Sequence, residues 1–175
     1  MKGGAELIVV GQVGYCGHRR VFTGFASAGD LVSASYVDTL DEQGHGYQRR
    51  MSREHSLEFK RYIQQPEATS IPLTFNLRKD FGSRWTLNEA KQVGHPSKLR
   101  LDLSQGPVLS QVDGQHRLGY LQDSPIQFAF MTYLGLTEAE ERNVFAVING
   151  KAKGLSSSLL DFINAKSLGS DLAAV

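Results

Sequence analysis

Apolar and polar residues alternate with different periods along this chain of 175 residues, and each change of period marks a predicted element. Near the N-terminus, residues 7–10 form a compact apolar run that stops at Gly11, which is typical of a buried strand. Residues 14–29 contain four glycines and predict a loop, and residues 31–37 predict a second strand. The polar residues 38–46 would close that strand.

The period becomes helical after Ser52. Met51, His55 and Phe59 fall on one face at helical spacing, with Ser52 as the expected N-cap, so a helix is predicted that ends before Pro66. His55 lies on the apolar stripe of this helix and is expected to face the core. Residues 71–77 then alternate as a strand does, with a proline that belongs at the start of a strand or on an edge.

The second half of the chain contains both strand and helix signals. Residues 99–103 alternate, residues 104–107 favour a turn, and residues 108–112 are apolar again, which predicts a hairpin. Residues 126–131 predict a further strand. Thr137 and Glu140 form a capping box for a helix that ends near Asn149 and Gly150, and residues 156–163 predict a last helix. Helices and hairpins are intermixed, so the sequence predicts an α+β domain and not a doubly wound sheet.

Composition narrows the possible partners. Hydrophobic residues make up 41% of the chain and charged residues 21%, which is ordinary for a globular domain. The formal net charge of +1 does not favour broad electrostatic binding, so any nucleic-acid contact needs a local basic patch. The apolar stretches are too short for a membrane span or a signal peptide, and the single Cys16 excludes an internal disulfide. We therefore expect a cytoplasmic protein with no membrane partner.

The pentapeptide Asp113–Arg117 is the strongest candidate for a site. It follows the strand predicted over residues 108–112 and precedes a short helical pattern. Gly114 allows close approach of the backbone to a ligand, and the first amides of a helix are without internal partners. Phosphate commonly binds at such a corner, where His116 and Arg117 would add two side chains that can carry positive charge.

The order of these motifs resembles that of the DGQHR-domain family, which includes the DndB-like proteins of DNA phosphorothioation systems. The resemblance covers about residues 45–165 and rests on the following segments: residues 47–49, 61–63, 71–76, 113–118, 145–149 and 151–155. It implies that residues 1–175 form a single domain with a ParB/sulfiredoxin-like fold, in which helices flank a small mixed sheet. The implied partners are DNA or a nucleotide, together with other DNA-modification proteins.

The resemblance also implies roles for particular residues. Gly114, Gln115, His116 and Arg117 would contact phosphate. Gln115 stands where sulfiredoxins have their reactive cysteine, and Asp113 also departs from their motif, so sulfiredoxin chemistry is not expected.

Basic and amide side chains elsewhere extend the candidate site. Arg49 is the best candidate for a second phosphate contact, with Gln48 beside it, although both could belong to a solvated basic face. Asn149, Lys151 and Lys153 follow the end of a helix and could contact DNA or phosphate, although lysines are favoured there by the helix dipole alone.

The pentapeptide supports more than one chemical role. Asp113 could be a cap for the following helix while Arg117 pairs with a nearby acid, which would be purely structural. His116 could act as a general acid or base, and Asp113 could be catalytic or hold Mg²⁺ against the phosphates of a nucleoside triphosphate, although capping is the simpler role for it.

Three functions follow from these roles. We expect a DndB-like regulatory domain that binds DNA or nucleotide phosphate in a bacterial DNA-modification or defence system. The first alternative is a Mg²⁺-dependent nucleotide hydrolase or nuclease that uses the same pentapeptide. The second alternative is a protein-interaction module without catalysis.

Overall fold

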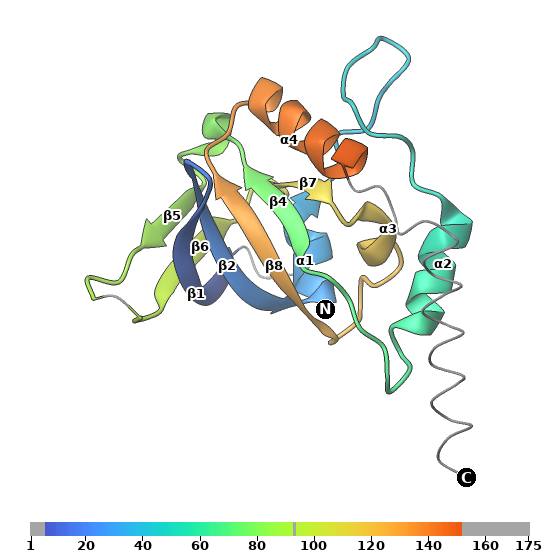
Figure 1. Ribbon diagram of the computed structural model, residues 1–175, viewed down its shortest axis with the longest axis horizontal. Helices are drawn as coiled ribbons and strands as arrows, with labels where there is room; N and C mark the ends of the chain where they lie inside the picture. Colours follow the sequence, from blue (N-terminus) through green and yellow to red (C-terminus); the bar gives the residue numbers. More distant parts are fainter. Residues whose placement is uncertain (1–5, 93, 152–175) are drawn as a thin grey trace, which may run out of the picture.

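A mixed eight-stranded β-sheet is the framework of the structure, a computed structural model that describes residues 6–92 and 94–151 (Figure 1). The strands are β1 Glu6–Cys16, β2 Arg19–Ser27, β3 Ser35–Tyr36, β4 Leu73–Leu77, β5 Trp85–Asn88, β6 Ser97–Asp102, β7 Leu109–Asp113 and β8 Gln127–Leu134. The helices are α1 Ala28–Ala34, α2 Arg53–Tyr62, the 3₁₀ helix η1 Lys79–Phe81, α3 Gln115–Leu118 and α4 Glu138–Lys151. The predicted α+β class is confirmed, although the sheet is larger than the small sheet expected.

Strand β8 holds the sheet together. The strand order is β3-β7-β4-β8-β2-β1-β6-β5, so β8 lies between β4 and β2. It pairs in parallel with β4 and antiparallel with β2. The half made of β3, β7 and β4 therefore joins the half made of β2, β1, β6 and β5 through this one strand.

The two faces of the sheet are covered by different helices. Phe22 belongs to a large core cluster that includes Leu31 of α1, whereas its neighbour Val21 belongs to a second cluster that includes Val144 of α4. Because successive side chains of a strand point to opposite faces, α1 and α4 cover opposite faces. Figure 1 shows the same arrangement, with α1 behind the sheet and α4 across one end of its front face.

The N-terminal region differs from its prediction. Residues 14–29 are not a loop, because β1 and β2 form a long antiparallel hairpin that turns at Gly17. The glycines within the strands make room for a ring: a Cβ at Gly11 would lie 2.6 Å from Cζ of Phe22. Residues 7–10 are also not a fully buried strand, because Ile8 and Val10 are each 54% exposed.

Helix α1 replaces most of the strand predicted over residues 31–37. The Ser27 hydroxyl accepts a hydrogen bond from the amide of Asp30 at 3.1 Å, which caps the helix. Leu31 and Ala34 are then fully buried at helical spacing. The strand β3 that follows is only two residues long.

The predicted hairpin over residues 99–112 is wrong, although both of its strands exist. Strand β6 pairs with β1 and β5, whereas β7 pairs with β3 and β4 at the other end of the sheet. Alternation and a turn sequence predict strands locally, but they do not fix which strand each one pairs with.

Two helix predictions are confirmed at their N-termini. The Ser52 hydroxyl accepts from the amide of His55 at 3.4 Å at the start of α2. Thr137 and Glu140 form the reciprocal capping box of α4, with distances of 2.8 and 3.3 Å. His55 itself is exposed, and Ser56 takes the buried position, so the expected core-facing histidine is wrong.

The last predicted helix, over residues 156–163, lies outside the described residues. No helix within residues 6–151 has both the length and the apolar character that crossing a membrane requires.

Candidate functional site

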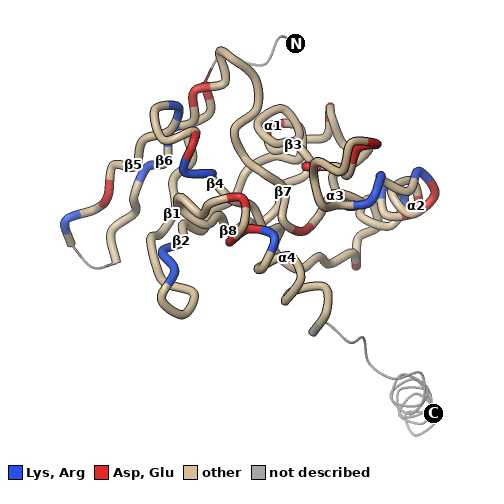
Figure 2. The backbone as a smooth tube through the Cα atoms, turned by 90° about the horizontal axis from the view of Figure 1, so that it is seen from above, with Lys and Arg blue, Asp and Glu red and all other residues tan. Residues whose placement is uncertain are grey.

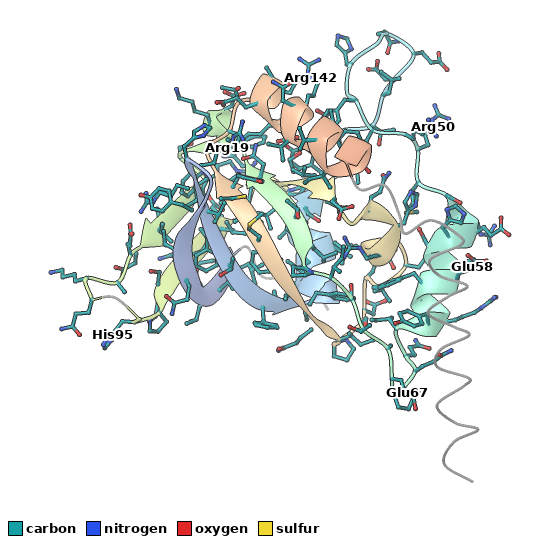
Figure 3. The ribbon with its side chains drawn as sticks, viewed as in Figure 1. Arg19, Arg50, Glu58, Glu67, His95 and Arg142 are labelled. Carbon is teal, nitrogen blue, oxygen red and sulfur yellow. The ribbon has the colours of Figure 1, made fainter. Side chains whose placement is uncertain are left out.

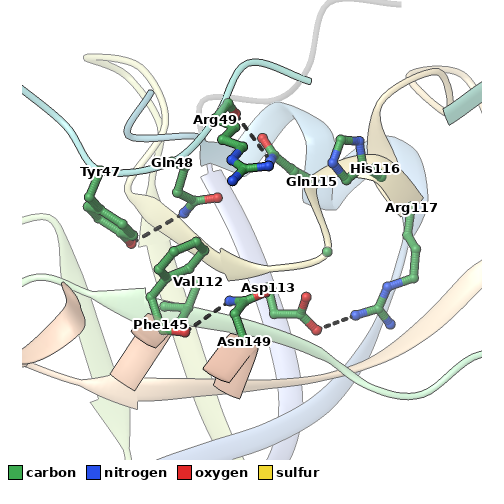
Figure 4. Close-up of a pocket in the computed structure, with 11 residues that line it drawn as sticks. Tyr47, Gln48, Arg49, Val112, Asp113, Gln115, His116, Arg117, Phe145 and Asn149 are labelled. Atoms are coloured by element: carbon green, nitrogen blue, oxygen red, sulfur yellow. Dashed lines mark hydrogen bonds and ion pairs between the residues drawn. The ribbon is translucent and has the colours of Figure 1, made fainter. Parts of the chain in front are cut away.

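A cavity of about 460 Å³ lies where the end of β7, the start of α3, the segment before α2 and the last turns of α4 meet (Figure 4). Its lining consists of Tyr47, Gln48, Arg49, Val112, Asp113, Gly114, Gln115, His116, Arg117, Phe145 and Asn149. The structure therefore brings together the pentapeptide and three further candidates from two distant segments.

Gly114 makes the sharp corner between β7 and α3. Its φ is +124°, a conformation that side chains disfavour, and a Cβ there would lie 2.5 Å from Cδ2 of Leu73. The amides of Arg117 and Leu118 donate to the Gly114 carbonyl at 2.9 and 3.1 Å. The corner agrees with the predicted strand–glycine–helix geometry. Helix α3 has only four residues, however, so its dipole adds little to anion binding.

Arg117 is engaged within the protein. Its Nη2 donates to Oδ2 of Asp113 at 2.5 Å, and its Nη1 donates to the Ile71 carbonyl at 2.5 Å and to the Ser70 hydroxyl at 3.3 Å. Burial lowers the pKa of Arg117, and the charge of Asp113 acts in the opposite direction. The structural role considered for Arg117, pairing with an acid, is therefore present.

Asp113 does not cap α3. Its carboxylate binds the Arg117 guanidinium, and the N-cap position belongs to Gly114, which makes no side-chain cap. The capping role expected for Asp113 is wrong because the arginine one turn later competes for the same carboxylate.

The described residues hold no group of three or more metal-ligating side chains. Asp113 supplies the one carboxylate of the cavity lining. A Mg²⁺ ion there would share this carboxylate with Arg117 and take most of its oxygen ligands from bound phosphate and water.

His116 and Gln115 present polar atoms that the described residues leave without a partner. Nδ1 of His116 is buried and has no hydrogen-bond partner within residues 6–151, and the same holds for Oε1 of Gln115. The His116 ring lies edge-on to that of His55, with centroids 5.9 Å apart. Nε2 of Gln115 donates to the Arg49 carbonyl at 3.3 Å, which ties the two segments together.

Gln48 and Arg49 are adjacent, but Gln48 is a buried structural residue and Arg49 is exposed to the cavity. Gln48 is 2% exposed, and its Nε2 donates to the Gln111 carbonyl and to the Tyr47 hydroxyl, so it anchors the segment to β7. Arg49 is exposed, lines the cavity and has no ion-pair partner among the described side chains. Arg49 is thus the cation best placed to meet an anionic ligand.

The C-terminal candidates are only partly described. Asn149 lines the cavity, and its Nδ2 donates to the Phe145 carbonyl at 2.9 Å. Lys151 is the last residue of α4, and its side chain is outside the description, as is the whole of Lys153.

A buried carboxylate behind the cavity was not predicted. Glu141 of α4 is fully buried and accepts hydrogen bonds from Tyr47 (2.7 Å), Asn76 (2.7 Å), Ser110 (2.6 Å) and Arg78 (2.9 and 3.1 Å). Asn76 and Ser110 stand opposite each other on β4 and β7, beneath α4. The cluster therefore fixes α4 and the Tyr47 segment to the sheet.

The hydrogen bonds of this cluster determine the protonation states of Glu141 and Tyr47. Burial alone would raise the pKa of Glu141, but hydrogen bonds from Arg78, Ser110, Asn76 and Tyr47 outweigh burial and lower that pKa below its ordinary 4.5. Burial and the Glu141 carboxylate raise the pKa of Tyr47. Glu141 is therefore a carboxylate and Tyr47 a neutral phenol at neutral pH.

Tyr47 and Phe145 form a wall of the cavity that the sequence did not assign. Their rings meet edge to face with centroids 4.9 Å apart. Both residues stand in segments that carry the family resemblance, which is the signal that could have pointed to them. Glu141 offered no such signal, because a glutamate in the first turn of a helix is ordinarily solvated.

The charges around the site are mixed. Figure 2 shows basic and acidic positions interspersed along the backbone, with both signs on α2. No protein-family model, curated protein or solved structure matches the chain.

Proposed function

We propose that this chain is a phosphate-binding module of the DGQHR family, with a ParB/sulfiredoxin-like fold and a DndB-like regulatory role. It would bind nucleotide or DNA phosphate in a bacterial DNA-modification or defence system in the cytoplasm. One observation carries the proposal: phosphate-contact candidates from three separate segments, represented by Arg49, Asp113–Arg117 and Asn149, line the same cavity.

The groups around the cavity suit a phosphate. The Arg49 guanidinium can donate two parallel hydrogen bonds to phosphate oxygens, and a ring N–H of His116 can donate one. The backbone amides of Gln115 and His116 and the Asn149 side-chain amide add neutral donors.

Arg117 contributes indirectly to phosphate binding. By pairing with Asp113 it cancels the one negative charge of the lining, which would otherwise repel an anion.

Binding of phosphate, of nucleoside mono- and triphosphates and of duplex DNA tests this proposal, with phosphate release followed in parallel. We expect Arg49→Ala to weaken phosphate and nucleotide binding at least tenfold, because it removes a charge-assisted hydrogen bond. Arg50→Ala is the matched control: Arg50 neighbours Arg49, does not line the cavity and projects outward (Figure 3).

The binding assays on the wild-type protein decide whether the proposal stands. If the wild type binds neither phosphate nor any nucleotide nor DNA, the proposal fails and the interaction module takes its place. Equal losses in Arg49→Ala and Arg50→Ala would show that the cavity is not the site.

One observation also favours a catalytic version of the same site. His116 lines the cavity, and the described residues leave its buried Nδ1 without a hydrogen-bond partner; an imidazole in this place has the chemistry of a general acid or base. If the protein is a hydrolase, His116→Ala should abolish turnover while nucleotide binding largely remains. If it is a regulator, the wild type should bind nucleotide or DNA without hydrolysing it, so no phosphate should be released.

A further inference from the structure

A second hollow lies on the open part of the sheet face that α4 covers at one end. It has a volume of about 630 Å³, and its lining includes Val10, Phe25, Ile71, Met131 and Ile148. Three of these side chains are unusually exposed for apolar residues: Val10 at 54%, Phe25 at 65% and Ile71 at 70%. A cluster of exposed apolar side chains of this kind marks a binding surface.

Strand register shows which residues form the floor of this hollow. Asp113 is opposite Thr74, Thr74 is opposite Met131, and Met131 is opposite Thr23, so these residues form one row across β7, β4, β8 and β2. Phe25 is opposite Ala129 two residues along, so it belongs to the next row on the same face. The first row spans three strand spacings, or roughly 14 Å.

The hollow adjoins the cavity described above. Asp113 lines both, and it ends the row that forms the floor of the hollow. The Arg117 guanidinium binds Asp113 on one side and the carbonyl of Ile71, at the rim of the hollow, on the other. The Asp113–Arg117 pair thus stands where the two hollows meet.

We infer that the apolar hollow receives unpaired bases and sugars of a single-stranded oligonucleotide while another phosphate of the same strand occupies the cavity, an inference that rests on the proposed function. The ligand that fits both parts carries an anion at one end and a flat, largely apolar group at the other. Phe25 offers an exposed ring on which a base can stack. A base inside a duplex has both faces covered by its neighbours, so the protein binds single-stranded DNA in preference to duplex.

Phe25→Ala tests the inference, with Tyr15→Ala as the matched control. Tyr15 is an aromatic residue of the same hairpin, is 72% exposed and does not line the hollow. The probes are inorganic phosphate, deoxyribose 5-phosphate, a single-stranded thymidine tetranucleotide and a DNA hairpin whose stem holds four thymidines in base pairs. We expect Phe25→Ala to weaken tetranucleotide binding about tenfold while binding of the two baseless probes is unchanged. Tyr15→Ala should bind all four as the wild type does.

The outcomes separate this inference from the proposed function. If phosphate binds but the tetranucleotide gains nothing over deoxyribose 5-phosphate, or Phe25→Ala has no effect, the inference is wrong and the phosphate site stands. If no probe binds, both fail. Sedimentation of the free protein gives a further test, because a dimer that Phe25→Ala converts to a monomer would make the hollow an interface between copies and overturn the inference.

Discussion

Gly114 is the residue on which the shape of the cavity depends. Its positive φ and its close approach to Leu73 both exclude a side chain. We expect Gly114→Ala to lower the free energy of unfolding by about 1–3 kcal/mol and to weaken phosphate binding, because backbone strain and the clash with Leu73 move the corner. Urea denaturation and phosphate titration measure the two effects.

Gly44→Ala is the control for that substitution. Gly44 has a φ of +85°, but a Cβ there would meet nothing within 4 Å. Gly44→Ala should lower the free energy of unfolding only by the cost of the strained backbone, and it should leave phosphate binding unchanged. A Gly114→Ala variant no less stable than Gly44→Ala would contradict the steric role of Leu73.

The Asp113–Arg117 pair yields a second prediction at the residue scale. Arg117→Ala should weaken phosphate binding, mainly because it leaves the Asp113 carboxylate unpaired beside the ligand. The double variant Asp113→Asn with Arg117→Ala should recover part of the loss, with a coupling of about 0.5–3 kcal/mol in a double-mutant cycle. If the losses of phosphate-binding free energy in the two single variants simply add in the double variant, Arg117 acts on the phosphate directly and not through Asp113.

The candidate site was predictable to the extent that its residues are neighbours in sequence. Residues 113–117 form a recognisable unit, whereas Arg49 was selected as a basic residue before a helix and Asn149 by its place at the end of another, and the cavity brings all of them together. Pairing of Arg117 with a nearby acid was one of the alternatives that the sequence offered, but its bond to the Ile71 carbonyl was not predictable, because the two residues become neighbours only in the folded sheet.

At the scale of elements, α4 depends on Glu141 for its attachment to the sheet. Glu141→Gln should lower the free energy of unfolding at pH 7 by about 3 kcal/mol, because Arg78 is left with less compensation in a buried setting. Chemical denaturation measures the change, and Glu58→Gln on the exposed side of α2 is the control.

The same carboxylate predicts the direction of a pH effect. The folded-state pKa of Glu141 lies below its ordinary 4.5, so its contribution is fully present above about pH 4.5 and is lost as pH falls through the folded pKa. The wild type should therefore lose more stability than Glu141→Gln between pH 5 and pH 3. Parallel curves for the two proteins in that interval would contradict the assignment.

Helices whose ends carry side-chain caps were predicted well, and elements defined by tertiary contacts were not. The caps Ser52 and Thr137 located the starts of α2 and α4. Helix α1 had a comparable signal in Ser27 and Asp30, but the apolar residues at 31–37 also fit a strand. The pairing of β7 with β4 depends on residues more than thirty positions apart, which no local pattern encodes.

For the whole molecule, the balance of charge predicts how DNA binding responds to salt. Basic and acidic residues are interspersed along the backbone (Figure 2). Arg49 is the arginine of the cavity lining that has no ion-pair partner within the described residues. Each neutralised phosphate lowers the logarithm of the association constant by about 0.7–0.9 per tenfold increase in salt. We expect about one to three such contacts, so a shallow slope, measured by anisotropy at several salt concentrations. A slope of about six or more would require a contact surface far beyond the cavity.

The position of β8 has a consequence for how the chain acquires its structure during synthesis. Among the strands of residues 6–151, residues 127–134 leave the ribosome last, yet they connect the two halves of the sheet. A nascent chain that ends before residue 127 has the β1–β2 hairpin and the strands around β4 but nothing between them. The cooperative step of folding therefore waits for the last strand, and chaperones would meet two open strand edges until it arrives.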